Sequence, residues 1–332
     1  MTFLASLRRC TAAVAATALA YTFLPAAAHA QDIPKPGGFP DRQIRLVVPF
    51  GAATPPDILG RIIGPALSAR IGVPVVVDNK PGANGNIGAA LTGASPPDGY
   101  TLVICGLTCA TADVFYKTPG FETRHDLAPV INIGAFPSVL IVGTNSPFKT
   151  APELFDYIRK HPGEVTYASY GRGGSPHLAA EQMATIGKLD MVHVPFGTSD
   201  PVLDVSSGRV TFMFIPAAAA LARKGLVHSL AVASGQREEM LPGLPTVAEF
   251  GFKGFNMEAW NGLYAAKNTP ADRLEYLNKQ MQAVLNDPDI KAQLFAAGLR
   301  VIGGSRAELA SYYDQDNKRW HQVADAAGIK PE

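Results

Sequence analysis

The sequence predicts an α/β protein of two lobes, each built on a mainly parallel sheet flanked by helices. The first observation is that short β-rich runs alternate with helical periodicity along almost the whole chain, an order typical of parallel sheets with helices on both faces. The second is length, because about 300 residues remain after the leader and can form two cores. The third is a pair of weak joins, at 134–138 and 251–256, where we place the crossings between lobes.

Residues 1–30 have the organisation of a secretory signal peptide. Arg8 and Arg9 precede an apolar run over 10–24, and a small-residue cleavage site lies directly before Gln31. The apolar run is too short to predict a membrane span. We therefore expect cleavage of the leader and export of the mature protein to the periplasm.

Lobe 1 is expected to comprise 31–136 plus 255–332. Its strands are expected at 44–50, 75–78, 101–105 and near 300–302. A first helix begins near Pro55, and Pro65 is expected to interrupt it with a kink. Further helices are expected at 84–93, 270–285, 289–297 and 306–326.

Lobe 2 is expected to comprise 137–254. Its strands are expected at 139–142, 165–168, 191–194, 210–214 and 228–233. Helices are expected between them at 152–161, 176–186, 201–206 and 217–224. Because strands and helices alternate, the ligand site is expected at the carboxyl ends of the strands, where strand-to-helix loops gather.

Composition excludes several classes of partner. The chain has 29 Lys and Arg residues against 28 Asp and Glu, and removal of the leader with Arg8 and Arg9 leaves 27 against 28, a net charge of −1. Nucleic acid and anionic membranes require a basic excess, so neither is expected as a partner. No metal-ligand cluster or cofactor motif is present, and we expect a monomer that needs no cofactor.

Two cysteines remain after the leader, Cys105 and Cys109. An oxidising compartment permits a disulfide between them. The preferred interpretation is two small buried residues at the end of a strand, with a short disulfide as the alternative. A metal site is not expected, because no His or Cys at ligand spacing lies nearby.

Two loops have the pattern of helix starts that favour anions. In Gly51–Ile58, Thr54 and Asp57 fit a capping box with Pro55 at the first helical position. Free N–H groups at a helix start attract anions, although Asp57 opposes an anion and could consume those donors itself.

The second such loop is ASYGRGGSPHL at 168–178. Ser175 is expected as N-cap with Pro176 as first helical residue. The glycines allow close backbone approach, and Arg172 could contact a carboxylate through two hydrogen bonds. The alternative for Arg172 is a loop residue that faces solvent.

Two further loops are weaker candidates. The segment NKPGANGNIGAA at 79–90 lacks the dinucleotide fingerprint, but backbone contact near Gly85 is open. The segment at 192–203 contains Phe196 and Thr198, which could reach the cleft, while His193 is expected to be a packed or hydrogen-bonded core residue. Trp260 is expected as an aromatic wall or as a core residue.

Catalysis is not expected from these loops. A hydrolase elbow requires Gly-x-Ser-x-Gly, whereas the second loop reads Gly-Arg-Gly-Gly-Ser, and a phosphate-binding loop would need Gly-Lys-Ser/Thr. A secreted hydrolase stays as an alternative, and it requires a Ser–His pair in hydrogen-bond reach in the cleft.

Several short segments share one family pattern. They include 40–50 (PDRQIRLVVPF), 76–88 (VVDNKPGANGNIG), 177–181 (HLAAE), 192–196 (VHVPF) and 244–249 (LPTVAE). In their order and spacing, over roughly 40–330, they resemble the substrate-binding proteins of tripartite tricarboxylate transporters, also called Bug receptors. The resemblance implies a two-lobe periplasmic-binding-protein fold that closes on a small organic anion in the cleft between lobes, with membrane permease subunits as partner. A receptor that signals to a membrane sensor is the other reading of the same fold.

The resemblance also implies that loops from both lobes hold a carboxylate. Together with the loops above, it gives the candidate ligand-binding residues Ala52, Ala53, Thr54, Asp57, Gly85, Ser169, Tyr170, Gly171, Arg172, Gly174, Ser175, Phe196, Thr198 and Trp260.

Three departures from the family pattern concern the ligand. Ala53-Thr54 replaces a Gly-Gly pair, Tyr170-Gly171-Arg172 replaces Ser-Gly-Asn, and Ile215-Pro216 stands where an Asp or Asn is common. The missing acid argues against an amino-acid ligand. Tyr170 and Arg172 favour an aromatic carboxylate over a small aliphatic di- or tricarboxylate.

Overall fold

The computed structural model describes residues 33–196 and 200–331. The predicted signal peptide and Thr198 therefore lie outside the described residues. Within them, no helix is both long and apolar enough to cross a bilayer.

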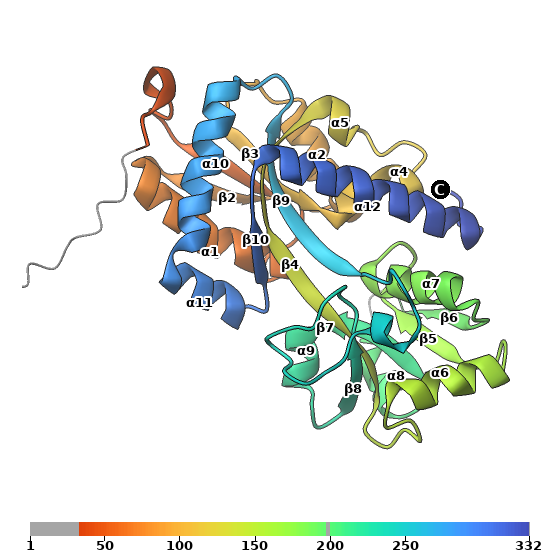
Figure 1. The fold of residues 1–332 in the computed structure, drawn as a ribbon. Coiled ribbons are helices and arrows are strands. Elements are labelled where there is room, and N and C mark those ends of the chain that lie inside the picture. Colours follow the sequence, from red (N-terminus) through yellow and green to blue (C-terminus); the bar gives the residue numbers. More distant parts are fainter. Residues whose placement is uncertain (1–32, 197–199, 332) are drawn as a thin grey trace, which may run out of the picture. The chain divides into compact units, whose positions relative to one another are not determined.

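Strands and helices alternate as predicted (Figure 1). The strands are β1 Ile44–Val48, β2 Val75–Asn79, β3 Thr101–Gly106, β4 Leu127–Gly143, β5 Thr166–Ser169, β6 Val192–Pro195, β7 Phe212–Pro216, β8 Val227–Val232, β9 Glu258–Ala266 and β10 Arg300–Gly303. The longer helices are α1 Pro55–Ile71, α2 Asn86–Gly93, α6 Ala151–Lys160, α7 Ser175–Gly187, α10 Ala271–Asn286, α11 Pro288–Ala296 and α12 Arg306–Ala326. Short helices are α3 Leu107–Ala110, α4 Ala112–Phe115, α5 Thr123–Asp126, α8 Val202–Ser206 and α9 Ala217–Ala222, with 3-10 turns η1 Pro36–Gly38, η2 Ala83–Gly85 and η3 Val247–Phe250.

Parallel pairing occurs in two places. β1 pairs with β2 and β3, and β5 pairs with β6 and β7, all in parallel. The helix-flanked α/β fold is thereby confirmed. Along the sheet the strand order is β2-β1-β3-β9-β4-β7-β5-β6, so β9 and β4 lie between the two parallel groups. They pair antiparallel with their neighbours, and this antiparallel pairing was not predicted.

β4 changes partners along its length. Its residues from Leu127 to Pro137 pair with β9, while Ser138 to Ile141 pair with β7 and Val139 to Gly143 pair with β8. Figure 1 shows β4 as one continuous yellow-green strand. The change of partner falls within the join expected at 134–138, and the lobe boundaries themselves stay a prediction.

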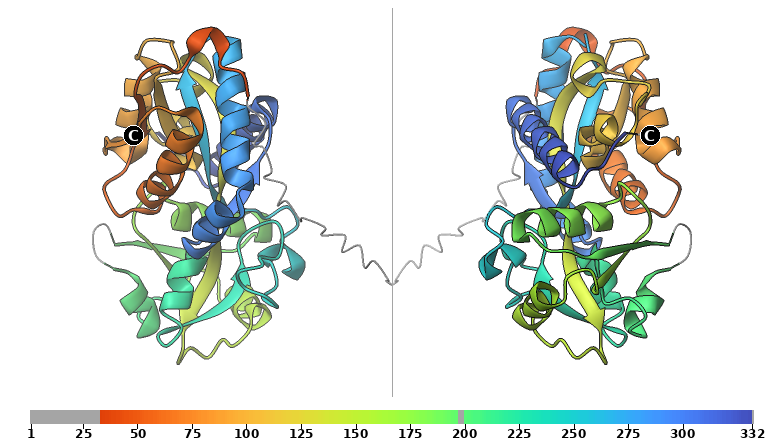
Figure 2. Two further views of the ribbon diagram at one scale, coloured as in Figure 1. Left: turned by 90° about the vertical axis from the view of Figure 1, so that its left-hand side faces the viewer. Right: turned by 90° about the vertical axis from the view of Figure 1, so that its right-hand side faces the viewer.

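The first sheet is built from both ends of the chain. Its strands β1, β2 and β3 come from the N-terminal part, and β9 and β10 come from the C-terminal part. In Figure 2 the orange N-terminal helix and the blue C-terminal helices lie side by side, in agreement with contacts of α1 with α10 and α11. α1 continues through Pro65 to Ile71, so the helix is not interrupted there, and the predicted kink stays a prediction.

Candidate functional site

A cavity of about 280 Å³ lies at the ends of four strands. Residues that end or follow β1, β3, β5 and β7 line it, together with part of β9. Larger cavities exist beside Arg300, around Phe148 and beside Lys188, at about 410, 490 and 400 Å³. None of them brings together the loops that follow several strands, which is where open α/β sheets bind ligands. We therefore take the 280 Å³ cavity as the candidate site.

The cavity wall is largely apolar. Its aromatic side chains are Phe50, Phe136, Tyr170 and Trp260, and its prolines are Pro55, Pro56, Pro176 and Pro216. Its polar side chains are Asn84, Thr108, Thr111, Ser175 and Asn261. Among the described residues, no Asp, Glu, Lys, Arg or His lines it. A ligand would therefore meet neutral donors and rings.

The first predicted loop forms the start of α1. Thr54 is the N-cap and Pro55 the first helical residue, as predicted. The predicted capping box was wrong, because the Thr54 hydroxyl donates to Gly51 O while Asp57 accepts from the Ala53 N–H at 2.9 Å. The remaining N–H groups are few, since Pro55 and Pro56 carry none.

Asp57 is buried and fully partnered. Besides the Ala53 N–H, it accepts from Arg61 Nε at 2.9 Å and from Asn79 Nδ2 at 2.8 Å. These hydrogen bonds, the one from Arg61 first, lower the pKa of Asp57 to about 2. Asp57 thus consumes donors of its own loop, as its position suggested. The predicted residues Ala52, Ala53, Thr54 and Asp57 do not line the cavity.

Replacing Asp57 by Asn is expected to destabilise the protein by about 1–2 kcal/mol at pH 7, because the amide lacks the charge that binds Arg61 and has one acceptor oxygen instead of two. The folded-state pKa of about 2 lies below the ordinary 3.8, so the stabilisation is present above pH 3.8 and is lost as the pH falls toward 2. Chemical denaturation of both proteins at pH 7 and pH 3 measures this. Asp156→Asn, in an exposed ion pair with Arg159, is the control. Equal stability of wild type and Asp57→Asn at pH 7 would contradict the assignment.

The second predicted loop reaches the cavity. Tyr170, Gly174 and Ser175 line it, and Tyr170 is 45% exposed. Gly174, with extended backbone, is the N-cap of α7, so the prediction of Ser175 as cap was wrong. Ser175 is instead the first helical residue. Among the described residues its hydroxyl makes no hydrogen bond, which leaves it available to a ligand.

Other residues of this loop lie behind the cavity wall. Arg172 is exposed and does not line the cavity. Burial lowers the pKa values of His177 and His193, and the Arg172 charge lowers them further. Ser169 and Gly171 also lie outside the wall. The Gly171 N–H donates to Ser169 Oγ at 3.0 Å, which fixes the turn.

The structure contains a Ser–His pair of the kind that a hydrolase requires. Ser169 Oγ lies 2.6 Å from His193 Nε2. Ser169 is 0% exposed, and neither residue lines the cavity. A nucleophile must reach its substrate, so this pair is explained better as a support for the loop. His193 is half-buried and hydrogen-bonded, as predicted.

Of the remaining predicted residues that the structure describes, Trp260 lines the cavity, whereas Gly85 and Phe196 do not. The Nε1 of Trp260 donates to the buried Asp316 at 2.6 Å. Gly85 is buried behind the wall, and its neighbour Asn84 lines the cavity. Phe196 packs against the apolar core around Ile215.

Sequence reasoning missed several wall residues. Phe50, Thr108 and Pro216 end or follow strands, so the strand-end rule could have identified them. Phe136 and Asn261 lie within strand segments that were not predicted, and nothing in the sequence indicated them.

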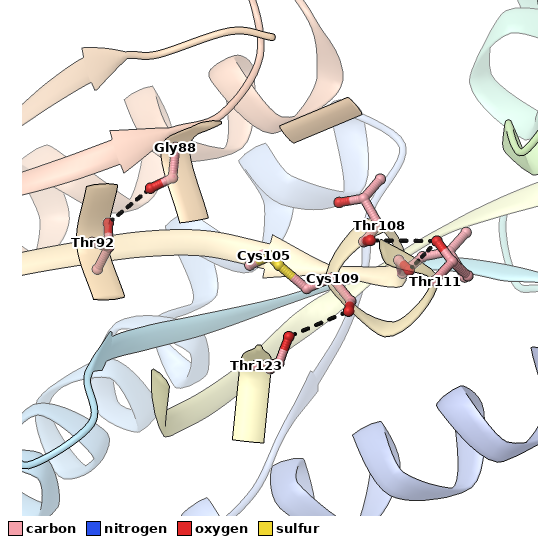
Figure 3. The surroundings of a disulfide bond; sticks show 8 residues. Gly88, Thr92, Cys105, Thr108, Cys109, Thr111 and Thr123 are labelled. Atoms are coloured by element: carbon pink, nitrogen blue, oxygen red, sulfur yellow. Dashed lines mark hydrogen bonds between the residues drawn. A yellow bond between two sulfur atoms is a disulfide. The ribbon is translucent and has the colours of Figure 1, made fainter. Parts of the chain in front are cut away.

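A disulfide supports the wall after β3. Cys105, which lines the cavity, is bonded to Cys109 in α3, so the preferred interpretation of two separate residues was wrong (Figure 3). Next to it the Thr111 hydroxyl donates to Leu107 O at 3.0 Å and Thr123 Oγ1 donates to Cys109 O at 3.3 Å. The Thr108 hydroxyl makes no hydrogen bond among the described residues. No metal-binding group of three or more His, Cys, Asp or Glu occurs in 33–196 or 200–331.

The chain matches a known family over most of its length. The sequence profile of the tripartite tricarboxylate transporter family receptor matches residues 59–329. A Pseudomonas sp. (strain P51) protein, described as a UPF0065 protein in the tcbD-tcbE intergenic region, is 35% identical over 86% of both chains. Protein BugT of Bordetella pertussis is 29% identical over 88% of this chain and 91% of its own.

Solved structures of similar proteins include two with bound carboxylates. R. palustris Rpa4515 with adipate is 32% identical, with a TM-score of 0.77 over 89% of this chain and 100% of its own. MatC (Rpa3494) from Rhodopseudomonas palustris with bound malate is 28% identical, with a TM-score of 0.71 over 86% of this chain and 99% of its own.

Proposed function

Because the chain belongs to the family of tripartite tricarboxylate transporter receptors, which are periplasmic solute-binding proteins, we propose that it captures a small organic carboxylate and delivers it to membrane permease subunits. The observation that carries the proposal is the 280 Å³ cavity, which strand-end loops of both parallel groups line with neutral donors. The adipate and malate of the two similar structures support a carboxylate as ligand.

The proposed carboxylate site is the start of α7. The Ser175 hydroxyl lies in a wall without competing anions. Pro176 carries no N–H, so the backbone donors proposed here are those of Ser175 and His177. A helix start carries partial positive charge, so a carboxylate there is stabilised without a cation. We propose Asn84 and Thr108 as further donors from the opposite wall. Arg172 stays the proposed charge partner, for which it would have to turn toward the cavity.

The proposed ligand is an aromatic monocarboxylate. The rings of Phe50, Phe136, Tyr170 and Trp260 offer flat apolar contact to an aromatic body. A second carboxylate would be buried among apolar groups, which costs several kcal/mol when no cation compensates it. Pro216, in the place of an acid, leaves no counter-charge for an amine. The adipate-bound relative makes an aliphatic dicarboxylate the competing ligand.

Matched ligand pairs test both the binding of a carboxylate and the preference for an aromatic monocarboxylate. Thermal melts of the mature protein with benzoate against terephthalate, and with hexanoate against adipate, isolate the effect of the second carboxylate. Malate and citrate extend the panel. A ligand at about 100 times its Kd stabilises by about 2.7 kcal/mol. Benzoate is expected to give the larger shift of its pair.

The outcomes separate cleanly. Shifts with adipate, malate or citrate alone would replace the aromatic ligand and leave the receptor function in place. The absence of any shift would contradict carboxylate binding.

Once a ligand has been identified, Ser175→Ala is expected to weaken its binding about tenfold, the effect of one charge-assisted hydrogen bond. Arg159→Ala, at an exposed position of helix α6, is the matched control and is expected to bind like wild type.

A further inference from the structure

A compact polar cluster lies under the second loop, outside the cavity wall. It consists of Tyr167 of β5, Ser169 at the end of β5, His177 and Glu181 of α7, and His193 of β6. The rings of His177 and His193 are 4.3 Å apart, and Tyr167 stacks on His193 at 4.9 Å. Buried polar groups require partners, so the hydrogen bonds of this cluster determine what it does.

Two of these side chains hold the loop backbone. Ser169 Oγ accepts the Gly171 N–H at 3.0 Å, and His177 Nδ1 accepts the Gly173 N–H at 3.3 Å. Gly173, whose N–H donates the second of these bonds, lines the cavity together with the next two residues, Gly174 and Ser175. The loop on the ligand side is therefore fixed from behind by two neutral acceptors.

The bond from Gly173 determines the state of His177. An amide N–H can only donate, so Nδ1 carries no proton and the imidazole is neutral with its proton on Nε2. Nε2 lies 3.8 Å from Glu181 Oε1, beyond hydrogen-bond distance, and that oxygen accepts the Tyr167 hydroxyl. Both His177 and Gly173 are buried, so water does not replace a lost bond.

We propose that His177 is a positioning residue for the ligand: its neutral Nδ1 holds the Gly173 amide and thereby keeps Gly173, Gly174 and Ser175 in the geometry that forms the cavity wall. This inference rests on the proposed function for its effect on affinity. The hydrogen bond itself does not depend on which ligand binds.

The surroundings favour the neutral state. Among the described residues, the titratable and charged groups that face His177 are Tyr167, Arg172, Glu181 and His193. Burial, then His193 and Arg172, lower the pKa of His177 to about 4. The anchor is therefore intact at neutral pH, and the stability that it contributes is present above the ordinary pKa of 6.5 and is lost as the pH falls toward 4.

Three substitutions test the anchor. Asn places an uncharged oxygen near the position of Nδ1, so His177→Asn is expected to bind within about threefold of wild type. His177→Leu leaves the buried Gly173 N–H without an acceptor and is expected to bind at least about tenfold more weakly. His125→Leu, at a histidine whose side chain is 81% exposed, is the control. Titration calorimetry with benzoate and with adipate as probes measures affinity, and circular dichroism checks folding.

A direct readout covers the case in which His177→Leu does not fold. Nitrogen-15 NMR of wild-type histidine side chains at pH 7 is expected to show His177 neutral and protonated on Nε2. The stability difference between pH 7.5 and pH 5 is expected to be smaller in His177→Asn than in wild type. A proton on Nδ1, or full affinity in a folded His177→Leu, would overturn the inference. Failure of wild type to bind either probe would count against the proposed function, while the NMR result would still decide the anchor.

Discussion

Replacing Arg300 by alanine is expected to lower the free energy of unfolding by about 3–5 kcal/mol, because it leaves two buried carboxylates without their cation. Arg300, the first residue of β10, forms ion pairs with Glu238 and Glu258. Glu238 is 4% and Glu258 5% exposed, and Tyr312 donates to Glu258 at 3.1 Å. Arg300 thus joins the segment after β8 to strands β9 and β10.

Chemical denaturation measures the loss, with Arg209→Ala as control. Arg209 pairs with Asp204 at an exposed position, and such pairs contribute about 0–1 kcal/mol. A rescue separates charge from packing: Arg300→Met combined with Glu238→Gln and Glu258→Gln is expected to regain most of the stability, since no unpaired charge remains. A loss below about 1 kcal/mol in Arg300→Ala would show that water or protonation compensates the carboxylates.

The pH dependence of Arg300→Ala has a definite sign. Burial already raises the pKa of Glu238, and removal of Arg300 takes away a charge that opposes this rise. An acid with a raised folded-state pKa is favoured at low pH and loses that stability as the pH rises. The deficit of Arg300→Ala against wild type is therefore expected to be smaller at pH 5 than at pH 7.5.

Replacing Gly106 by alanine is expected to have the second largest effect, a loss of about 3 kcal/mol or more together with loss of ligand binding. A Cβ at this position would lie 1.9 Å from the backbone oxygen of Trp260 and 2.7 Å from its carbonyl carbon. Backbone atoms of a central strand cannot move aside alone. Because Gly106 and Trp260 both line the cavity, a shift of β3 against β9 alters the site directly.

Gly225→Ala is the matched control for this glycine. A Cβ there meets nothing within 4 Å, so a change within about 0.5 kcal/mol is expected. Denaturant unfolding and the ligand-dependent thermal shift are measured on both variants. Similar stability and binding of Gly106→Ala and Gly225→Ala would mean that the two strands can separate without consequence, contrary to the close approach seen here.

Local patterns predicted most elements of this fold. Helices such as α7 and α12 carry their own periodicity and start signals, and parallel strands such as β1 and β5 are short β-rich runs between them. β9 and the first half of β4 were not predicted. For β4 the physical reason is visible in the sequence. Pro129, Gly134 and Pro137 suggest breaks in β4, yet bulges absorb the irregularity and the strand continues against β9.

The site was predictable only in part, for a similar reason. Tyr170, Gly174, Ser175 and Trp260, which were predicted to contact the ligand, line the cavity, because loops after strands, and an aromatic beside a join, have local signatures. Asp57 shows the limit of such reasoning. Its spacing from Thr54 fits a capping box, but Arg61 and Asn79 draw the carboxylate to other donors. Competition among partners from distant segments is not visible in the spacing of two residues.

The origin of the first sheet in both ends of the chain has a consequence for the order of assembly. β3 and the first half of β4 are synthesised long before β9, the strand that pairs with both of them. Until Glu258–Ala266 has been made, each keeps an open edge of unpaired backbone groups, which is a template for pairing between chains. Completion of this sheet is therefore a late event, and a product that ends before Glu258 would be prone to aggregate even though most of its helices and strands are present.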